Sequence, residues 1–330
     1  MAADDNDVMS TARHADLPSH TLPNVPHGTV RLHDWGVIRA QGADAAKFLH
    51  GQLTQDVEHL QDGDVKLAGY CSAKGRLHAT FVMWRRGPEE VLLACSADLL
   101  PTVLKRLSMF VLRAKCKLSD ASAELPLWGL AGPAAAGGAE GGGAVVGGAD
   151  GGDADGGELL QLPDAVVAGA PVARALRVGG IEPSKPTLDI EAWRWLEVHS
   201  GVARIVAATS EQFVPQMVNL ELVGGVNFQK GCYPGQEIVA RSQYRGTLKR
   251  RAYVLESALP LQPGQEVFLA GVAEQPAGMV ALAGSWDGRH AGLVELKIAA
   301  LAAGTLHAGS ADGPVLTLAS LPYAIPADAA

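Results

Sequence analysis

Alternating apolar positions predict strands in the first third of the chain. In the stretch 77–84 apolar side chains occupy both alternating sets of positions, which predicts a strand covered on both faces. A turn at 73–76 joins it to a second predicted strand at 67–72. Apolar residues at helical spacing over 97–107 predict an amphipathic helix, with Ser96 as its N-cap.

The rest of the chain alternates helical and strand patterns. A helix is predicted at 191–201, where Trp193 and Trp195 are two positions apart. Side chains at that spacing do not share a helix face, so at least one tryptophan should be partly exposed or line a cleft. Beyond residue 251, short apolar runs separated by Gly and Pro predict a small β-barrel, with strands at 253–255, 266–269, 277–283, 292–296 and 315–318.

These patterns predict an α+β fold in which two mixed αβ segments surround a central cleft and a C-terminal barrel closes it. The expected organisation is a disordered tail at 1–26, a first αβ segment at 27–130, a flexible insertion at 131–158, a second αβ segment at 159–251 and the barrel at 252–330. The insertion is almost entirely Gly, Ala and Asp, a composition that buries too little apolar surface to offset its chain entropy.

Composition narrows the class of protein. The 330 residues are 48% hydrophobic and 19% charged, which is typical of a soluble globular protein. A net charge of −8 argues against stable nucleic-acid binding. No run approaches a membrane span or a signal peptide. The four cysteines are far apart and form no metal-site or cluster-site spacing, so we expect a reducing, cytoplasmic environment and no metal. We also expect the protein to be a monomer.

The densest chemistry lies between residues 224 and 251. Gly231 and Gly235 bracket a Cys-Tyr-Pro turn, and a predicted helix starts at Gln236. Cys232 thus precedes a helix N-terminus and follows Lys230 by two residues, an arrangement that favours a reactive thiolate. The alternative is that Cys232 is a small buried apolar side chain.

Positive charge is concentrated just after this cysteine. The cations are Arg241, Arg245, Lys249, Arg250 and Arg251. A local basic region on an acidic chain suggests an anionic ligand, either a carboxylate or a phosphate. The alternative for Arg241 is an ordinary helix ion pair with Glu237.

The same run resembles the signature of the folate-binding YgfZ family, in the superfamily of the glycine-cleavage T-protein, an aminomethyltransferase. The resemblance is carried by Lys230-Gly-Cys-Tyr-x-Gly-Gln-Glu237, Arg241, Arg245-Gly246 and Lys249-Arg250, and by two earlier segments at 42–57 and 71–76. It implies the aminomethyltransferase-like fold and tetrahydrofolate, or a one-carbon derivative, as ligand.

The resemblance also implies roles for individual residues. Cys232 is the reactive group, and the folate-binding candidates are Lys230, Tyr233, Gln236, Glu237, Arg241, Arg245, His199, Lys74 and Arg76. Tyr233, Tyr244 or one of the two tryptophans could stack on the pterin. The non-functional alternatives are a solvated turn for Lys74 and Arg76, an ordinary surface histidine for His199 and core packing for each aromatic ring.

The sequence departs from the T-protein pattern at two positions. An Asp-Asp pair is replaced by Ala79-Thr80, and a pterin-binding glutamate by His199. The resemblance therefore implies an accessory protein that supports iron–sulfur enzymes or their assembly factors, including an enzyme that methylthiolates tRNA. Two alternatives stay open: a folate-dependent aminomethyltransferase, and a non-catalytic scaffold whose basic helix docks a protein or RNA.

Overall fold

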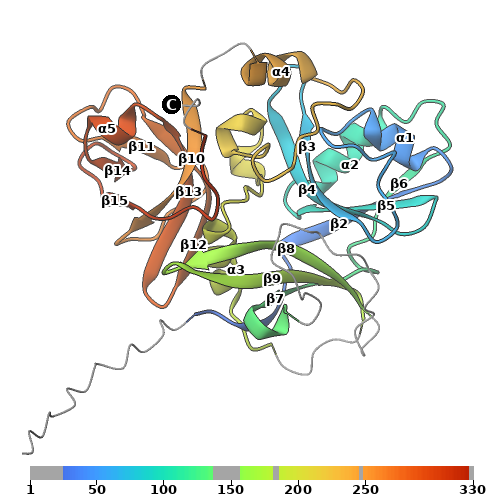
Figure 1. The fold of residues 1–330 in the computed structure, drawn as a ribbon, viewed down its shortest axis with the longest axis horizontal. Helices are drawn as coiled ribbons and strands as arrows, with labels where there is room; N and C mark the ends of the chain where they lie inside the picture. Colours follow the sequence, from blue (N-terminus) through green and yellow to red (C-terminus); the bar gives the residue numbers. More distant parts are fainter. Residues whose placement is uncertain (1–24, 137–156, 181–185, 245–247, 327–330) are drawn as a thin grey trace, which may run out of the picture.

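The computed structural model describes residues 25–136, 157–180, 186–244 and 248–326. Its strands form a five-stranded sheet, a four-stranded sheet and a closed six-stranded barrel (Figure 1). This confirms the predicted α+β fold with a C-terminal barrel. Most of the predicted tail and insertion lies outside the described residues. Within these residues no helix has the length and apolar character needed to cross a bilayer.

The five-stranded sheet contains the first predicted strands. Its spatial order is β3 (Val65–Cys71), β4 (Leu77–Arg85), β5 (Glu90–Ser96), β2 (Trp35–Gln41) and β6 (Lys117–Asp120). The helices α1 (Ala45–His50) and α2 (Leu100–Ser108) pack on it. As predicted, β4 is buried along both faces up to Trp84. The predicted N-cap Ser96 is wrong, because Ser96 is paired with Trp35 in the sheet and α2 starts later, beside Pro101.

Both predicted αβ segments contribute to the four-stranded sheet. Its antiparallel order is β1 (Gly28–Arg31), β7 (Leu127–Ala131), β9 (Ala170–Val178) and β8 (Glu158–Val167), and the short helix η1 (Gly132–Ala134) follows β7. The two segments therefore interlock rather than fold as separate units.

Helix α3 (Ile190–His199) lies between this sheet and the barrel. Trp193 packs against the sheet, while Trp195 faces the barrel with its ring centroid 5.4 Å from that of Trp286. The two tryptophans are 0% and 1% exposed, so the prediction of a partly exposed tryptophan is wrong. A Cβ on Gly284 would lie 2.2 Å from the backbone nitrogen of Trp195, which shows how closely the barrel approaches. Both tryptophans are buried, although they lie on opposite faces of α3, because the helix packs against the sheet on one side and the barrel on the other.

The barrel confirms all five predicted strands and adds a sixth. Its strands are β10 (Arg250–Ser257), β13 (Arg289–Lys297), β12 (Gly278–Trp286), β11 (Glu266–Leu269), β14 (Leu306–Ala308) and β15 (Val315–Leu318), with α5 (Ala300–Ala303) between β13 and β14. In the chain, α3 and the barrel are separated by three short helices: η2 (Ala207–Thr209), η3 (Pro215–Val218) and α4 (Gln236–Tyr244). The position of α4 confirms the helix predicted from Gln236.

Candidate functional site

The loop that carries Cys232, residues 226–235 and here called the motif loop, is anchored to the segment that follows α1. The ammonium of Lys230 is buried and donates hydrogen bonds to the backbone carbonyls of His50 and Leu53, the latter at 2.9 Å. A buried ammonium must be bonded in this way to offset its lost hydration. Lys230 therefore seats the loop from inside.

Two polar side chains of the same segment hold the two glycines that precede the motif loop. The buried Thr54 hydroxyl donates to the carbonyl of Gly225 at 2.6 Å, and the Gln55 amide donates to the carbonyl of Gly224 at 2.6 Å. In return, the backbone N–H of Asn227 donates to the Thr54 carbonyl at 2.9 Å. These two side chains position the loop. The sequence analysis placed Thr54 within the family-like segment 42–57 but assigned a role to neither residue, because Thr and Gln have many surface uses.

The end of the motif loop rests on the turn between β3 and β4. Gly235 has a φ of +78°, and a Cβ there would lie 2.3 Å from the carbonyl oxygen of Ser72. Only glycine allows this backbone approach without strain. On the other side of the contact, a Cβ on Gly75 would lie 2.8 Å from the Cβ of Ile238 in α4. Two segments far apart in the sequence, the 72–76 turn and the junction of the motif loop with α4, thus meet at one place.

Cys232 is the accessible cysteine of the chain. Cys71 and Cys95 are buried, and burial raises the pKa of each thiol to about 12. Cys116 is half-buried, and burial raises its pKa to about 11. Cys232 alone is exposed, so it is the thiol that a partner or a small molecule can reach.

The charge nearest to Cys232 within the motif loop belongs to Lys230. Burial lowers the pKa of Lys230 to about 8, and its electrostatic interactions with Asp56, Cys232 and Glu58 act in the opposite direction. The cysteine also lies four residues before the start of α4. The thiol is therefore accessible and interacts electrostatically with the Lys230 ammonium, rather than being packed in an apolar interior.

The remaining motif residues have different environments. Tyr233 is buried, and burial raises the pKa of its hydroxyl. Its ring lies 4.8 Å from the Lys230 ammonium, so it forms part of the loop's support. Gln236 is half-buried and Glu237 exposed, both in the first turn of α4.

The predicted folate-binding cations Lys74, Arg76 and Arg241 are exposed. Arg76 also donates a hydrogen bond to the carbonyl of Gln212. Because the 72–76 turn packs against the first turn of α4, Lys74 lies beside that helix, and Arg241 is one turn further along it. Arg245 lies outside the described residues.

One exposed aromatic ring accompanies these cations. Tyr244, at the end of α4, is 70% exposed and stacks edge-on against Phe228 with ring centroids 5.8 Å apart. It lies one turn from Arg241. Arg241 and Tyr244 are exposed on α4, and Lys74 is exposed on the turn that packs against this helix; these three residues, here called the α4 face, combine an aromatic ring with positive charge.

His199 lies apart from the motif loop, on α3 against the barrel. It is buried, its ring centroid is 4.0 Å from that of Trp195, and its Nε2 has no hydrogen-bond partner among the described residues. Burial and the nearby positive charge of Arg289 lower the pKa of His199 to about 4. The interpretation of an ordinary surface histidine is therefore wrong.

We expect this histidine to make the fold sensitive to acid. An unfolded chain binds a proton at His199 below about pH 6.5, whereas the folded protein resists it down to about pH 4, so stability falls as the pH falls through this window. A His199→Gln variant should lose less stability than wild type between about pH 7 and about pH 4.5, by on the order of 2–3 kcal/mol. Urea unfolding at both pH values measures the difference. Equal losses in the two proteins would contradict it.

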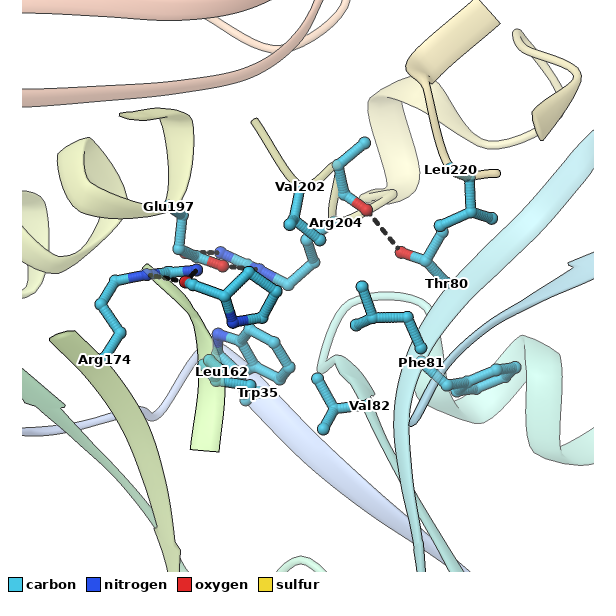
Figure 2. Close-up of a pocket in the computed structure, with 13 residues that line it drawn as sticks. Trp35, Thr80, Phe81, Val82, Leu162, Arg174, Glu197, Val202, Arg204 and Leu220 are labelled. Carbon is cyan, nitrogen blue, oxygen red and sulfur yellow. Dashed lines mark hydrogen bonds and ion pairs between the residues drawn. The ribbon is translucent and has the colours of Figure 1, made fainter. Parts of the chain in front are cut away.

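A narrow cavity of about 30 Å³ lies at the centre of the molecule, between β4 and α3 (Figure 2). Apolar side chains, among them Trp35, Phe81 and Leu220, form much of its wall. Its polar lining comprises Thr80, Arg174 and an ion pair in which Arg204 donates two hydrogen bonds of 2.9 Å to the carboxylate of Glu197. At this volume the cavity has room for about one or two waters.

The Glu197–Arg204 pair is fully buried and linked to further groups. Arg204 also bonds Ser96 at 3.1 Å and Asp34 at 3.2 Å, and its guanidinium lies 4.9 Å from the Trp35 ring. Sequence reasoning missed this pair, although a charged Glu197 between apolar Leu196 and Val198 in a helix was a detectable signal.

Thr80 occupies the cavity wall at one of the two positions where the sequence lacks a carboxylate. Its hydroxyl donates to the carbonyl of Ala203 at 3.0 Å (Figure 2) and accepts from the backbone N–H of Ile205 at 3.0 Å. Both bonds join β4 to the segment after α3. The Thr80 hydroxyl therefore stabilises the packing of these two segments.

A wider cleft of about 630 Å³ lies between the five-stranded sheet, α3 and the barrel. Asp34, Glu191 and Arg194 line it, and Arg194 pairs with Asp34 at 2.9 Å. None of the predicted folate-binding residues lines this cleft or the central cavity.

Comparisons with known proteins identify relatives of this chain. No protein-family model matches the chain. The tRNA-modifying protein YgfZ of Serratia proteamaculans is 32% identical over 290 residues, which cover 86% of this chain and 83% of that protein. The protein of the same name from Klebsiella pneumoniae is 33% identical over 253 residues, covering 72% and 74%.

A solved structure shows the same fold. The glycine cleavage system aminomethyltransferase T of Bartonella henselae aligns over 90% of this chain and 86% of its own, with a TM-score of 0.64 and 16% identity. The expected aminomethyltransferase-like fold is thereby confirmed. On the identity and coverage of its curated relatives, the chain belongs to the YgfZ family.

Proposed function

We propose that the protein is a tetrahydrofolate-binding accessory protein that supports the assembly or repair of iron–sulfur clusters in other enzymes, with Cys232 as its reactive group. The observation that carries this proposal is the exposed Cys232 thiol, held beside the Lys230 ammonium on a loop fixed by two other parts of the chain. The relatives are named tRNA-modifying proteins, which supports tRNA-modifying cluster enzymes as the proteins served.

One cysteine restricts the chemistry available. Among the described residues no three His, Cys, Asp or Glu side chains come together as a metal site. A lone thiol can react with a sulfur or one-carbon group, or ligate a cluster in passing, whereas holding a cluster takes several such ligands. In this proposal the cluster is therefore the cargo of the partner enzyme. The free state of all four cysteines supports a reducing, cytoplasmic location.

The α4 face carries predicted folate-binding residues, whereas neither the central cavity nor the wider cleft is lined by any of them. Small-molecule sites usually have at least about 300 Å³, and the central cavity, at about 30 Å³, does not fit a pterin in this shape. On the α4 face, the exposed Tyr244 ring offers a stacking surface, and Lys74 and Arg241 offer charge for the carboxylates of the glutamate tail. Bound there, tetrahydrofolate would supply a one-carbon carrier near Cys232.

Titration with tetrahydrofolate tests the folate assignment. Calorimetry without oxygen should detect binding by the wild type, and Arg241→Ala should weaken it about tenfold or more, because a charge-assisted hydrogen bond contributes about 1.5–3 kcal/mol. Arg194→Ala, which removes a cation from the wider cleft, should bind as the wild type does. No binding by the wild type, or weaker binding only in Arg194→Ala, would contradict the α4 face as the site.

A further inference from the structure

An apolar turn follows α2 and is open to solvent. Met109 is 58% exposed, Phe110 50% and Leu112 84%. The turn is nevertheless held in place, because the N–H of Phe110 donates to the Leu107 carbonyl at 3.0 Å and Val111 packs against the core. Large apolar side chains exposed together commonly mark an interaction surface.

Unpaired positive charge surrounds this turn. Residues 105–117 contain five Lys and Arg and no Asp or Glu, in a chain with a net charge of −8. Lys105, Arg113 and Lys115 are exposed, and none of them takes part in an ion pair among residues 25–136, 157–180, 186–244 and 248–326. We call the exposed Lys105, Met109, Phe110, Leu112, Arg113 and Lys115 the basic apolar patch.

The helix α1 connects the patch to the motif loop. At its start, the Asp44 carboxylate accepts a hydrogen bond of 2.7 Å from the backbone N–H of Lys115. At its end, His50 accepts the bond from Lys230, and a Cβ on Gly231 would lie 3.5 Å from the His50 ring. A six-residue helix is about 9 Å long, so a protein seated on the patch is large enough to reach Cys232.

We propose that the basic apolar patch docks the enzyme served by Cys232, through an apolar pocket on that enzyme bordered by Asp and Glu. This inference rests on the proposed function and names the docking surface. Met, Phe and Arg are enriched at protein interfaces, and the partner's carboxylates would complement the unpaired cations. RNA contacts use phosphates and stacked bases, which leave Met109 and Leu112 unexplained. The acidic remainder of the chain would also repel RNA or an anionic membrane beyond the patch.

Binding to a purified iron–sulfur tRNA methylthiotransferase tests the docking surface. Leu112→Ser and Arg113→Glu should each weaken its binding about tenfold or more, since central apolar and arginine anchors dominate interfaces. Both side chains are exposed, so the fold should be retained, which circular dichroism checks. The matched control is Leu318→Ser, a 56% exposed leucine on the barrel, which should bind as the wild type does. No binding by the wild type, or equal binding by all variants, would overturn the proposal.

Two further experiments test whether the patch binds RNA or membrane instead, and whether docking depends on Cys232. Binding of bulk tRNA, or of phosphatidylglycerol vesicles, that is lost in Leu112→Ser and Arg113→Glu would assign the patch to RNA or membrane and overturn the proposal. Cys232→Ser should dock the methylthiotransferase with unchanged affinity. Failure of the proposed function would instead be seen as activity retained by Cys232→Ser in cells, so the two failures are distinguishable.

Discussion

Replacing Cys232 with serine should abolish the support of iron–sulfur enzymes in cells while leaving the fold intact. The substitution exchanges one exposed atom, so packing and the hydrogen bonds of Lys230 to the His50 and Leu53 carbonyls are retained. A serine hydroxyl stays neutral at physiological pH and is a poor ligand for iron, whereas a thiolate is both a nucleophile and a cluster ligand. The chemistry should therefore be lost without a loss of stability.

The measurement is the amount of methylthiolated tRNA in cells that lack their own copy of the gene and carry each variant. Cys116→Ser is the matched control, because that half-buried cysteine is distant in sequence from the motif loop, and it should restore the modification as the wild type does. Thermal unfolding of the purified variants checks the fold. Full restoration of the modification by Cys232→Ser would refute the role assigned to the thiol.

Replacing Arg204 with methionine should destabilise the folded protein by about 3–5 kcal/mol. Burial by itself lowers the pKa of Arg204, but the Glu197 and Asp34 carboxylates raise it above its ordinary value, so the guanidinium stays charged. Methionine keeps much of the volume and removes the charge. The Glu197 carboxylate, which is equally buried, then loses both hydrogen bonds of 2.9 Å and keeps only the electrostatic interaction with Arg174.

Urea unfolding of three proteins measures this effect. The double variant Glu197→Leu/Arg204→Met removes both charges and should recover much of the lost stability, because replacing a buried pair by apolar groups is often neutral. Asp34 keeps a partner in each variant, since Arg194 lies 2.9 Å away. If Arg204→Met unfolds within about 1 kcal/mol of the wild type, or the double variant is less stable than the single one, the pair does not hold the centre of the fold in this way.

Local sequence patterns predicted helices and strands correctly where the pattern of apolar residues alone defines the element. The two-sided burial of β4, the helix from Gln236 and five barrel strands all follow from residue periodicity and Gly and Pro punctuation. The predicted exposure of a tryptophan failed because it assumed a helix with a single buried face. Trp193 and Trp195 are both buried because α3 has a sheet on one side and a barrel on the other.

The candidate site residues were likewise predicted where local sequence sufficed and not where long-range contacts decide. The sequence identified Cys232, Lys230 and the cations of the α4 face, since their types and spacing are local properties. It left core packing of Tyr233 open as an alternative, but it did not indicate that Lys230 is buried beneath the loop or that His199 lies against the barrel. Those facts depend on contacts with segments more than 80 residues away in sequence.

By itself, the sequence determined which elements form, which thiol has a cation nearby in the chain, and which family pattern the chain resembles. Tertiary structure alone decided which segments meet. Lys230 reaches the His50 and Leu53 carbonyls, and Gly235 rests on Ser72, only after the first and second αβ segments interlock. The physical reason is that periodicity records whether a position is covered, whereas the identity of the covering group is set by long-range packing.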